Sequence, residues 1–158
     1  MTIKVIGVGN MHRGDDAAGL LAASDLRRKL DPEIDVIETI GEPTKLLAAW
    51  GDAETVILID ASAPSGNTGC IKRIVAGEAP LPKEASASST HSLSLADAIE
   101  LAETLGERPA RILIFAIEGA NFGIGEELSP AVERALPLLV EQVRKEISTI
   151  NREAAAHA

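Results

Sequence analysis

Short apolar runs alternate along this chain with stretches whose apolar residues recur every three or four positions. The runs at 3–8, 34–39, 55–60 and 111–117 predict strands. All but the second are apolar enough to be covered on both faces, as in a parallel sheet. The run at 69–75 alternates less regularly and carries Lys72 and Arg73, so it predicts an edge or antiparallel strand protected by charge.

The stretches between these runs have helical spacing. Residues 15–30 place Ala18, Ala22, Leu26 and Leu30 on one face, 43–50 begin with proline, and 92–105 end before Gly106. A C-terminal helix follows Ser129-Pro130, and Pro137 within its pattern predicts either a kink there or a helix that begins later than Pro130. Fraying is expected over 154–158. The stretch 77–90, rich in Ala, Pro and Ser, predicts a mobile loop. Strand and helix alternation predicts an α/β fold, with a parallel or mostly parallel sheet between helix layers.

Composition narrows the class of protein. The chain has 158 residues, 24 acidic against 15 basic side chains, a net charge of −9 and 46% hydrophobic residues. No linker divides it, so we expect a single domain over 1–158. The acidic balance argues against nucleic acid as a partner, and neither a membrane span nor a signal peptide is recognisable, so we expect a cytoplasmic protein. The single cysteine, Cys70, is predicted to be a small buried residue.

Three groups of polar residues are expected at the carboxyl ends of the strands, where open α/β sheets bind ligands. Asp15 and Asp16 follow the turn Gly7-Val8-Gly9-Asn10, Asp60 ends an apolar strand, and His91 precedes a helix. Asp15 is interpreted as a helix cap, so Asp15→Asn should cost a few tenths to about 1 kcal/mol. Asp16 then lies in the first turn, over the sheet edge. Asp60 is read equally as a turn former or a functional carboxylate, and His91 as a surface residue or a ligand, with His12 an accessory candidate.

Two carboxylates and one imidazole suit divalent Ni, Zn, Mn or Fe and leave coordination positions open for chemistry. The chain has neither an HExxH helix nor a GxSxG elbow, which disfavours the standard hydrolase classes. The glycine turn also allows a dinucleotide site with Glu38 as the ribose-binding acid. Against that site, His12 stands where the third glycine of GxGxxG would be.

The chain resembles the hydrogenase maturation endopeptidases from Ile3 to about Ile147. The resemblance lies in the order and spacing of four segments: Gly7-Val8-Gly9-Asn10 with Asp15-Asp16, Val56-Ile57-Leu58-Ile59-Asp60-Ala61, Thr90-His91-Ser92-Leu93-Ser94-Leu95, and Ser129-Pro130-Ala131-Val132. It implies a three-layer fold with a mixed, mainly parallel five-stranded sheet and helices on both faces. It also implies a nickel-dependent peptidase that removes the C-terminal extension from the precursor of a NiFe hydrogenase large subunit.

That family's metal-contacting residues carry over to Asp16, Asp60 and His91, with the nickel supplied by the substrate. Asp16 is often glutamate in the family, one methylene longer, and Met11-His12-Arg13 is more polar than the typical segment. These departures concern substrate choice more than chemistry. We expect a monomer that binds neither nucleic acid nor membrane.

Other readings keep the fold and change the function. One is a non-enzymatic chaperone that checks the nickel of the same precursor, and another is a nucleotide-binding regulator that uses the glycine turn. A third is an ester or amide hydrolase resembling peptidyl-tRNA hydrolase, which the acidic surface disfavours because a tRNA ligand needs a basic groove.

Overall fold

A five-stranded mixed sheet forms the centre of the computed structural model, which describes residues 2–78 and 90–157 except for the side chains of 90–94. The strand order is β2-β1-β3-β5-β4. The first four of these pair in parallel, and β4 pairs antiparallel with β5 at the edge. The strands are β1 (Ile3–Val8), β2 (Asp35–Thr39), β3 (Thr55–Ser62), β4 (Ile71–Val75) and β5 (Arg111–Glu118). The predicted fold class and the antiparallel edge strand are confirmed.

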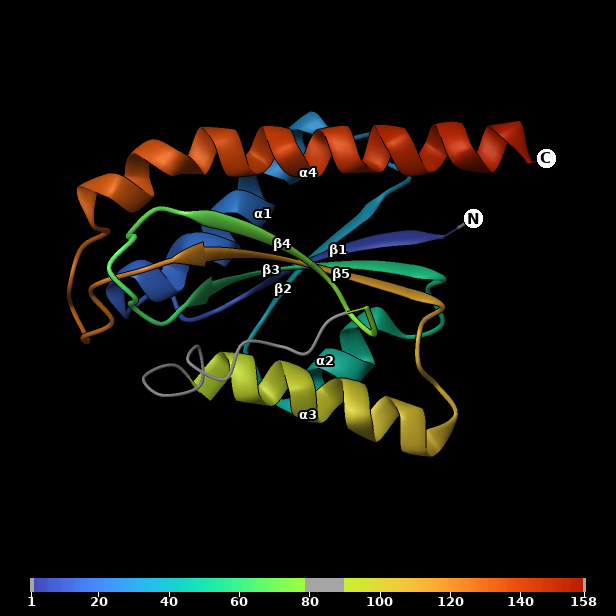
Figure 1. Ribbon diagram of the computed structural model, residues 1–158, viewed down its shortest axis with the longest axis horizontal. Helices are drawn as coiled ribbons and strands as arrows, with labels where there is room; N and C mark the ends of the chain where they lie inside the picture. Colours follow the sequence, from blue (N-terminus) through green and yellow to red (C-terminus); the bar gives the residue numbers. More distant parts are fainter. Residues whose placement is uncertain (1, 79–89, 158) are drawn as a thin grey trace.

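Helices cover both faces of the sheet, which makes three layers (Figure 1). On one face lie α1 (Ala18–Lys29), preceded by the short 3-10 turn η1 (Gly14–Ala17), and the long α4 (Pro130–Ala156). On the other face lie α2 (Pro43–Trp50) and α3 (Thr90–Leu105). Because parallel strands joined by crossover helices end at one edge, the loops that follow β1, β3 and β5 share the carboxyl edge of the sheet.

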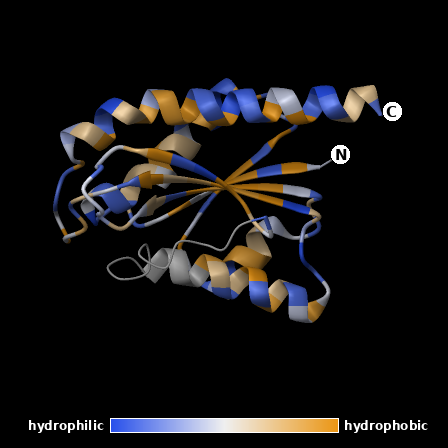
Figure 2. Cartoon of the chain, in the orientation of Figure 1, coloured by the Kyte–Doolittle hydropathy of each residue, from blue (hydrophilic) through white to orange (hydrophobic). Residues whose placement is uncertain are grey.

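Two aliphatic cores fill the spaces between the layers. Alternate residues of the central strands point to opposite faces, so Ile57 and Leu113 pack under α1 and α4 while Leu58 and Ile112 pack under α2 and α3. The centre of the sheet is accordingly hydrophobic in Figure 2, whereas the helices carry hydrophilic stripes. The edge strands β2 and β4 carry charged residues as well. Trp50, 1% exposed, anchors α2 in the second core.

The C-terminal helix α4 agrees with one of the two alternatives predicted for it and extends further than expected at its end. It begins at Pro130 and contains Pro137, and its first turns run at an angle to the remainder in Figure 1, as expected of a kink. A proline ring removes one hydrogen bond and pushes on the preceding turn, which bends a helix where tertiary packing holds both halves. Residues 154–156 are helical where fraying was expected, since alanine has the highest helix propensity. Most of the predicted loop over 77–90 falls outside the described residues.

Cys70 corrects another prediction, because its side chain is exposed rather than buried. It stands just before β4, in a turn where its amide donates a hydrogen bond to the carbonyl of Asn67 (2.9 Å). The strand β4 therefore begins at Ile71, two residues later than the sequence suggested. In the described part of the chain, no helix is both long enough and apolar enough to span a bilayer.

Candidate functional site

Asp16 lies in η1 at the carboxyl edge of the sheet and is only 2% exposed. The turn before it is held close to β1, since the amide of Asn10 donates to the carbonyl oxygen of Asp16 (3.3 Å). Gly9 makes this approach possible, because a methyl group there would lie 2.0 Å from that same oxygen. Gly9, the second glycine of the turn, thus allows the backbone of Asp16 to pack against the end of β1.

Asp60 comes to the same edge from β3 and is also 2% exposed. One turn after Asp16, Gly19 presses against β3, where an added methyl group would lie 2.3 Å from the carbonyl oxygen of Ile59. Asp16 and Gly19 are three residues apart on a helical stretch and therefore on neighbouring positions of one face. The contact between Gly19 and the residue before Asp60 places the backbones of Asp16 and Asp60 at one part of the edge.

The structure also changes the local reading of Asp60. The strand does not end there but continues to Ser62, with Asp60 paired opposite Ala116 of β5. Its Oδ1 accepts a hydrogen bond from the amide of Ala61 (2.8 Å). Of the two interpretations that the sequence left open, the turn former is therefore wrong, because Asp60 is a buried strand residue. The interpretation as a functional carboxylate stays a prediction, and a carboxyl group buried in an apolar strand is a candidate for such a role.

His91 stands in the first turn of α3, and its side chain lies outside the described residues. Figure 1 shows that α3 begins near the edge where β3 and β5 end, on the opposite face of the sheet from α1. The backbone therefore sets His91 at the same edge as Asp16 and Asp60. Among the side chains that the structure describes, no three His, Cys, Asp or Glu residues form a metal-binding group.

Asp15 is not the helix cap that the sequence suggested. Its fully buried carboxylate reaches across to the loop between β5 and α4: Oδ2 accepts from the amides of Ala120 (2.7 Å) and Asn121 (2.9 Å), and from the Ser129 hydroxyl (2.6 Å). Oδ1 accepts from the Ser129 amide (2.7 Å). Burial raises the pKa of this carboxyl, but the hydrogen bonds outweigh burial and hold the pKa below its usual 3.8. Asp15 is a tertiary anchor, whereas Arg13 occupies the cap position of η1.

Sequence reasoning missed Glu118, which plays a similar part for a second loop. It ends β5 and is 4% exposed. Its carboxylate accepts hydrogen bonds from the Ser65 hydroxyl and from the amide of Asn67 (2.6 Å). Burial raises the pKa of Glu118, and the bonds from Ser65 and Asn67 lower it more, with help from the charge of Lys72. The sequence did contain a signal for Glu118, because it is a charged residue at the end of an otherwise apolar strand. The same signal led to Asp60.

Two further candidates make structural contacts, His12 through its backbone and Glu38 through its side chain. His12 is exposed, its amide donates to Asn10 Oδ1 (2.9 Å), and its carbonyl accepts from the amide of Gly125 (2.9 Å). Glu38, the proposed ribose-binding acid, forms an ion pair with Arg27 of α1 (2.9 Å). The ion pair of Glu38 and the 3-10 turn that follows the glycine turn both disfavour the dinucleotide site.

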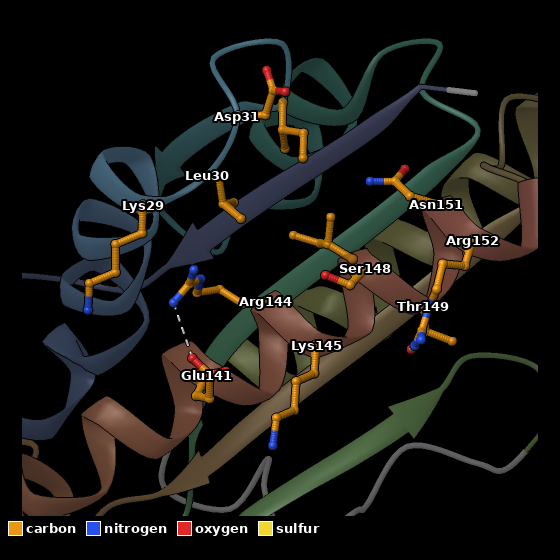
Figure 3. Close-up of a pocket in the computed structure, with 12 residues that line it drawn as sticks. Lys29, Leu30, Asp31, Glu141, Arg144, Lys145, Ser148, Thr149, Asn151 and Arg152 are labelled. Atoms are coloured by element: carbon orange, nitrogen blue, oxygen red, sulfur yellow. Dashed lines mark hydrogen bonds and ion pairs between the residues drawn. The ribbon is translucent and has the colours of Figure 1, made fainter. Parts of the chain in front are cut away.

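A groove of about 590 Å³ lies between α4 and the connection from α1 to β2 (Figure 3). Its polar lining includes the pair Arg144 and Glu141, 3.3 Å apart. Leu30 and Ile34, which also line it, precede β2, so this groove borders the amino edge of the sheet. Asp16, Asp60 and His91 do not line it, and it is separate from the candidate site.

The fold and the site together define an α/β protein with two buried carboxyl groups at the carboxyl edge of a mainly parallel sheet. The model of the hydrogenase maturation protease family matches residues 21–146. This chain therefore belongs to the hydrogenase maturation protease family and is an endopeptidase, a hydrolase. The resemblance seen in the sequence motifs is confirmed.

Individual relatives agree with this assignment. The chain is 26% identical over 153 residues to a putative hydrogenase maturation protease of Methanocaldococcus jannaschii, covering 90% of this chain and 97% of the relative. It is 26% identical over 145 residues to the hydrogenase 2 maturation protease of Escherichia coli, covering 90% and 88%.

Solved structures show the same fold. The hydrogenase maturating endopeptidase HybD of E. coli superimposes with a TM-score of 0.78 at 25% identity, covering 94% of this chain and 93% of that one. The NiFe hydrogenase maturation protease HybD of Thermococcus kodakarensis gives 0.74 at 26% identity, with 92% and 98% covered.

Proposed function

We propose that this protease removes the C-terminal extension of a NiFe hydrogenase large-subunit precursor after nickel insertion. In this proposal Asp16, Asp60 and His91 contact nickel that the substrate carries. The observation that supports it most directly is the pair of almost fully buried carboxyl groups, each 2% exposed, at one edge of the sheet. Carboxylate and imidazole are ligands that a divalent nickel ion accepts.

The burial of Asp16 and Asp60 gives a physical reason for nickel dependence. Both residues are shielded from water, where the attraction between a carboxylate and a cation is stronger than in bulk solvent. A divalent cation on the substrate would be attracted to both carboxylates, so a nickel-loaded precursor gains binding energy that a nickel-free precursor lacks. That contact would also fix the position of the precursor's C-terminal segment against the protease, which reduces the entropy cost of the cleavage step.

The donor set also suits a site that inspects nickel without retaining it. Two carboxylates and one imidazole offer no thiolate, so free nickel should bind weakly. Nickel already held by the thiolates of the precursor would complete its coordination with donors from Asp16, Asp60 and His91. Cleavage would then follow metal loading and would not strip the metal from the substrate.

The test is the intact mass of a large-subunit precursor from the same organism after incubation with the protease, with nickel-loaded and nickel-free substrate compared. We expect loss of one defined C-terminal peptide from the loaded precursor alone. Asp16→Asn, Asp60→Asn and His91→Gln should each slow this cleavage by at least about 100-fold, since even outer-shell partners of a metal site are worth up to that factor.

Matched controls test whether the loss of cleavage depends on the position of the substituted side chain or only on its type. Asp52→Asn removes an exposed carboxylate at the opposite end of β3, and His157→Gln removes an exposed imidazole at the end of α4. Both should cleave at the wild-type rate. Full cleavage by all three site variants would refute the metal-contact assignment. Binding of loaded precursor without any cleavage by the wild type would favour a nickel-checking chaperone instead.

A further inference from the structure

Large apolar side chains exposed on this protein gather at the carboxyl edge of the sheet. Five are exposed in the described part of the chain: Met11, Ile40, Leu105, Ile124 and Leu138. Three of them, Met11, Ile40 and Ile124, belong to loops that follow β1, β2 and β5. We call these three residues the rim patch. Ile124 has the most exposed side chain of the five, at 84%.

One backbone hydrogen bond and one side-chain hydrogen bond join the loops that carry Met11 and Ile124. The amide of Gly125, next to Ile124, donates to the carbonyl of His12, next to Met11 (2.9 Å). The Arg13 guanidinium donates through Nε to the carbonyl of Phe122 (3.1 Å). The two exposed side chains therefore extend from neighbouring positions on a fixed double loop.

The same loops are tied to the site. The amide of Asp15 donates to the carbonyl of Asn121 (2.7 Å), which links the double loop to η1 beside Asp16. On the other side, the amide of Gly9 donates to the carbonyl of Thr39 (3.1 Å), the residue before Ile40. The rim patch is thus continuous with the edge that carries the candidate catalytic carboxyl groups.

Single exposed apolar residues are ordinary, but three at the rim of one functional edge call for a partner. The chain carries a net charge of −9, so most of its surface favours water over an apolar contact. The loops are held by hydrogen bonds before any partner arrives, which lowers the entropy cost of binding there. A protease must bind polypeptide at its active edge, and apolar side chains bordering that edge fit apolar side chains of the substrate.

We infer that the rim patch is a docking surface for an apolar segment of the precursor next to the cleavage site, an inference that rests on the function proposed above. The patch would determine which precursor is recognised, whereas Asp16, Asp60 and His91 would determine whether that precursor carries nickel. Substitutions in the rim patch would then affect recognition of the precursor without affecting detection of its nickel.

The experiment compares binding and cleavage by a rim variant, Met11→Ser/Ile124→Ser, with the wild type. Dissociation constants are measured with nickel-free precursor, and KM and kcat with nickel-loaded precursor. We expect the Kd and KM to rise by about 10- to 100-fold, since burying each side chain is worth roughly one factor of ten, and kcat to stay within about twofold. Met11→Leu/Ile124→Leu keeps apolar surface and should bind within about threefold of the wild type.

Leu105→Ser and Leu138→Ser are matched controls, because these residues are 55% and 56% exposed but belong to α3 and α4 and not to the loops that carry the rim patch. They should leave Kd and KM unchanged, and a thermal melt of every variant checks that it is folded. A serine rim variant that binds as tightly as the leucine variant and the controls would overturn the inference while leaving the proposed function intact. Absence of any binding by the wild type would refute both.

Discussion

Replacing Asp15 by asparagine should destabilise the fold far more than removal of a helix cap would. The carboxylate accepts four hydrogen bonds, three on Oδ2 and one on Oδ1, and all four donors belong to the segment 120–129. An asparagine would keep three acceptor contacts by turning its amide nitrogen toward the single donor, the Ser129 amide. Two N–H groups would then face each other in a site that is fully buried.

The size of the effect follows from the kinds of bond that change. A hydrogen bond to a charged group contributes about 1.5–3 kcal/mol, against about 0.5–1.5 kcal/mol between neutral groups. Asp15→Asn loses one charged bond outright and makes the remaining three neutral. Because bonds in one network are not additive, we expect the free energy of unfolding to fall by about 3–5 kcal/mol, a large part of the roughly 5–15 kcal/mol typical of a domain.

The same carboxylate gives this contribution a pH dependence with a definite sign. Burial raises the pKa of Asp15, and the hydrogen bonds from Ala120, Asn121 and Ser129 lower it below 3.8 in the folded protein. A carboxyl whose pKa is lowered by folding stabilises the fold above its unfolded pKa, and that stabilisation is lost as the pH falls through the folded pKa. The stability gap between the wild type and Asp15→Asn should therefore be constant near neutral pH and shrink below about pH 4.

Urea unfolding followed by the fluorescence of Trp50 measures these free energies, because this single tryptophan is buried in the fold. The control is Asp52→Asn, which removes an exposed carboxylate and should change stability by less than about 0.5 kcal/mol. If Asp15→Asn lowered the free energy of unfolding at pH 7 by less than about 1 kcal/mol, that result would refute the argument. The four hydrogen bonds would then contribute no more than an ordinary helix N-cap.

Two further predictions concern other points that hold the site. Glu118→Gln should lower stability by about 1–3 kcal/mol by weakening charged hydrogen bonds, and should speed hydrogen exchange at the Asn67 amide, while Glu127→Gln, an exposed control, should change neither. Gly19→Ala should cost about 3 kcal/mol or more or prevent folding, because the new methyl group would lie 2.3 Å and 2.6 Å from backbone oxygens of β3 and β1. Gly123→Ala meets only a flexible side chain, so a thermal melt showing equal losses for the two glycine variants would contradict this reasoning.

The fold was predictable because its elements carry strong local patterns. The apolar strands and the proline-started helix over 43–50 agree with β1, β3, β5 and α2 to within two residues. The ends of elements were less predictable, since they depend on contacts with other segments. Pro137 illustrates this dependence, because the sequence left open whether the helix would bend there or begin later. Packing of Leu139 and Val140 in the core decides for one continuous helix.

The sequence predicted where the candidate site lies in the fold, because the topology of the sheet determines that location. The rule that parallel strands share a carboxyl edge places Asp16, Asp60 and the first turn of α3 together. The partners of Asp15 and Glu118 were not predictable, because they are distant in sequence and depend on how the loops fold against one another. A cap motif is local and visible in sequence, whereas a carboxylate bound by a segment more than 100 residues away leaves no local pattern.

The adjacent residues Asp15 and Asp16 divide two tasks that would conflict in one side chain. A carboxylate bound by four protein donors, as in Asp15, has its charge already stabilised and has little affinity left for a cation. In our proposal Asp16 faces substrate nickel from the very next position, so the anchor that fixes the double loop also fixes the backbone that presents the metal contact. Weakening the anchor should then impair both nickel-gated cleavage and rim-patch binding, whereas changing Asp16 should impair cleavage and leave binding of nickel-free precursor intact.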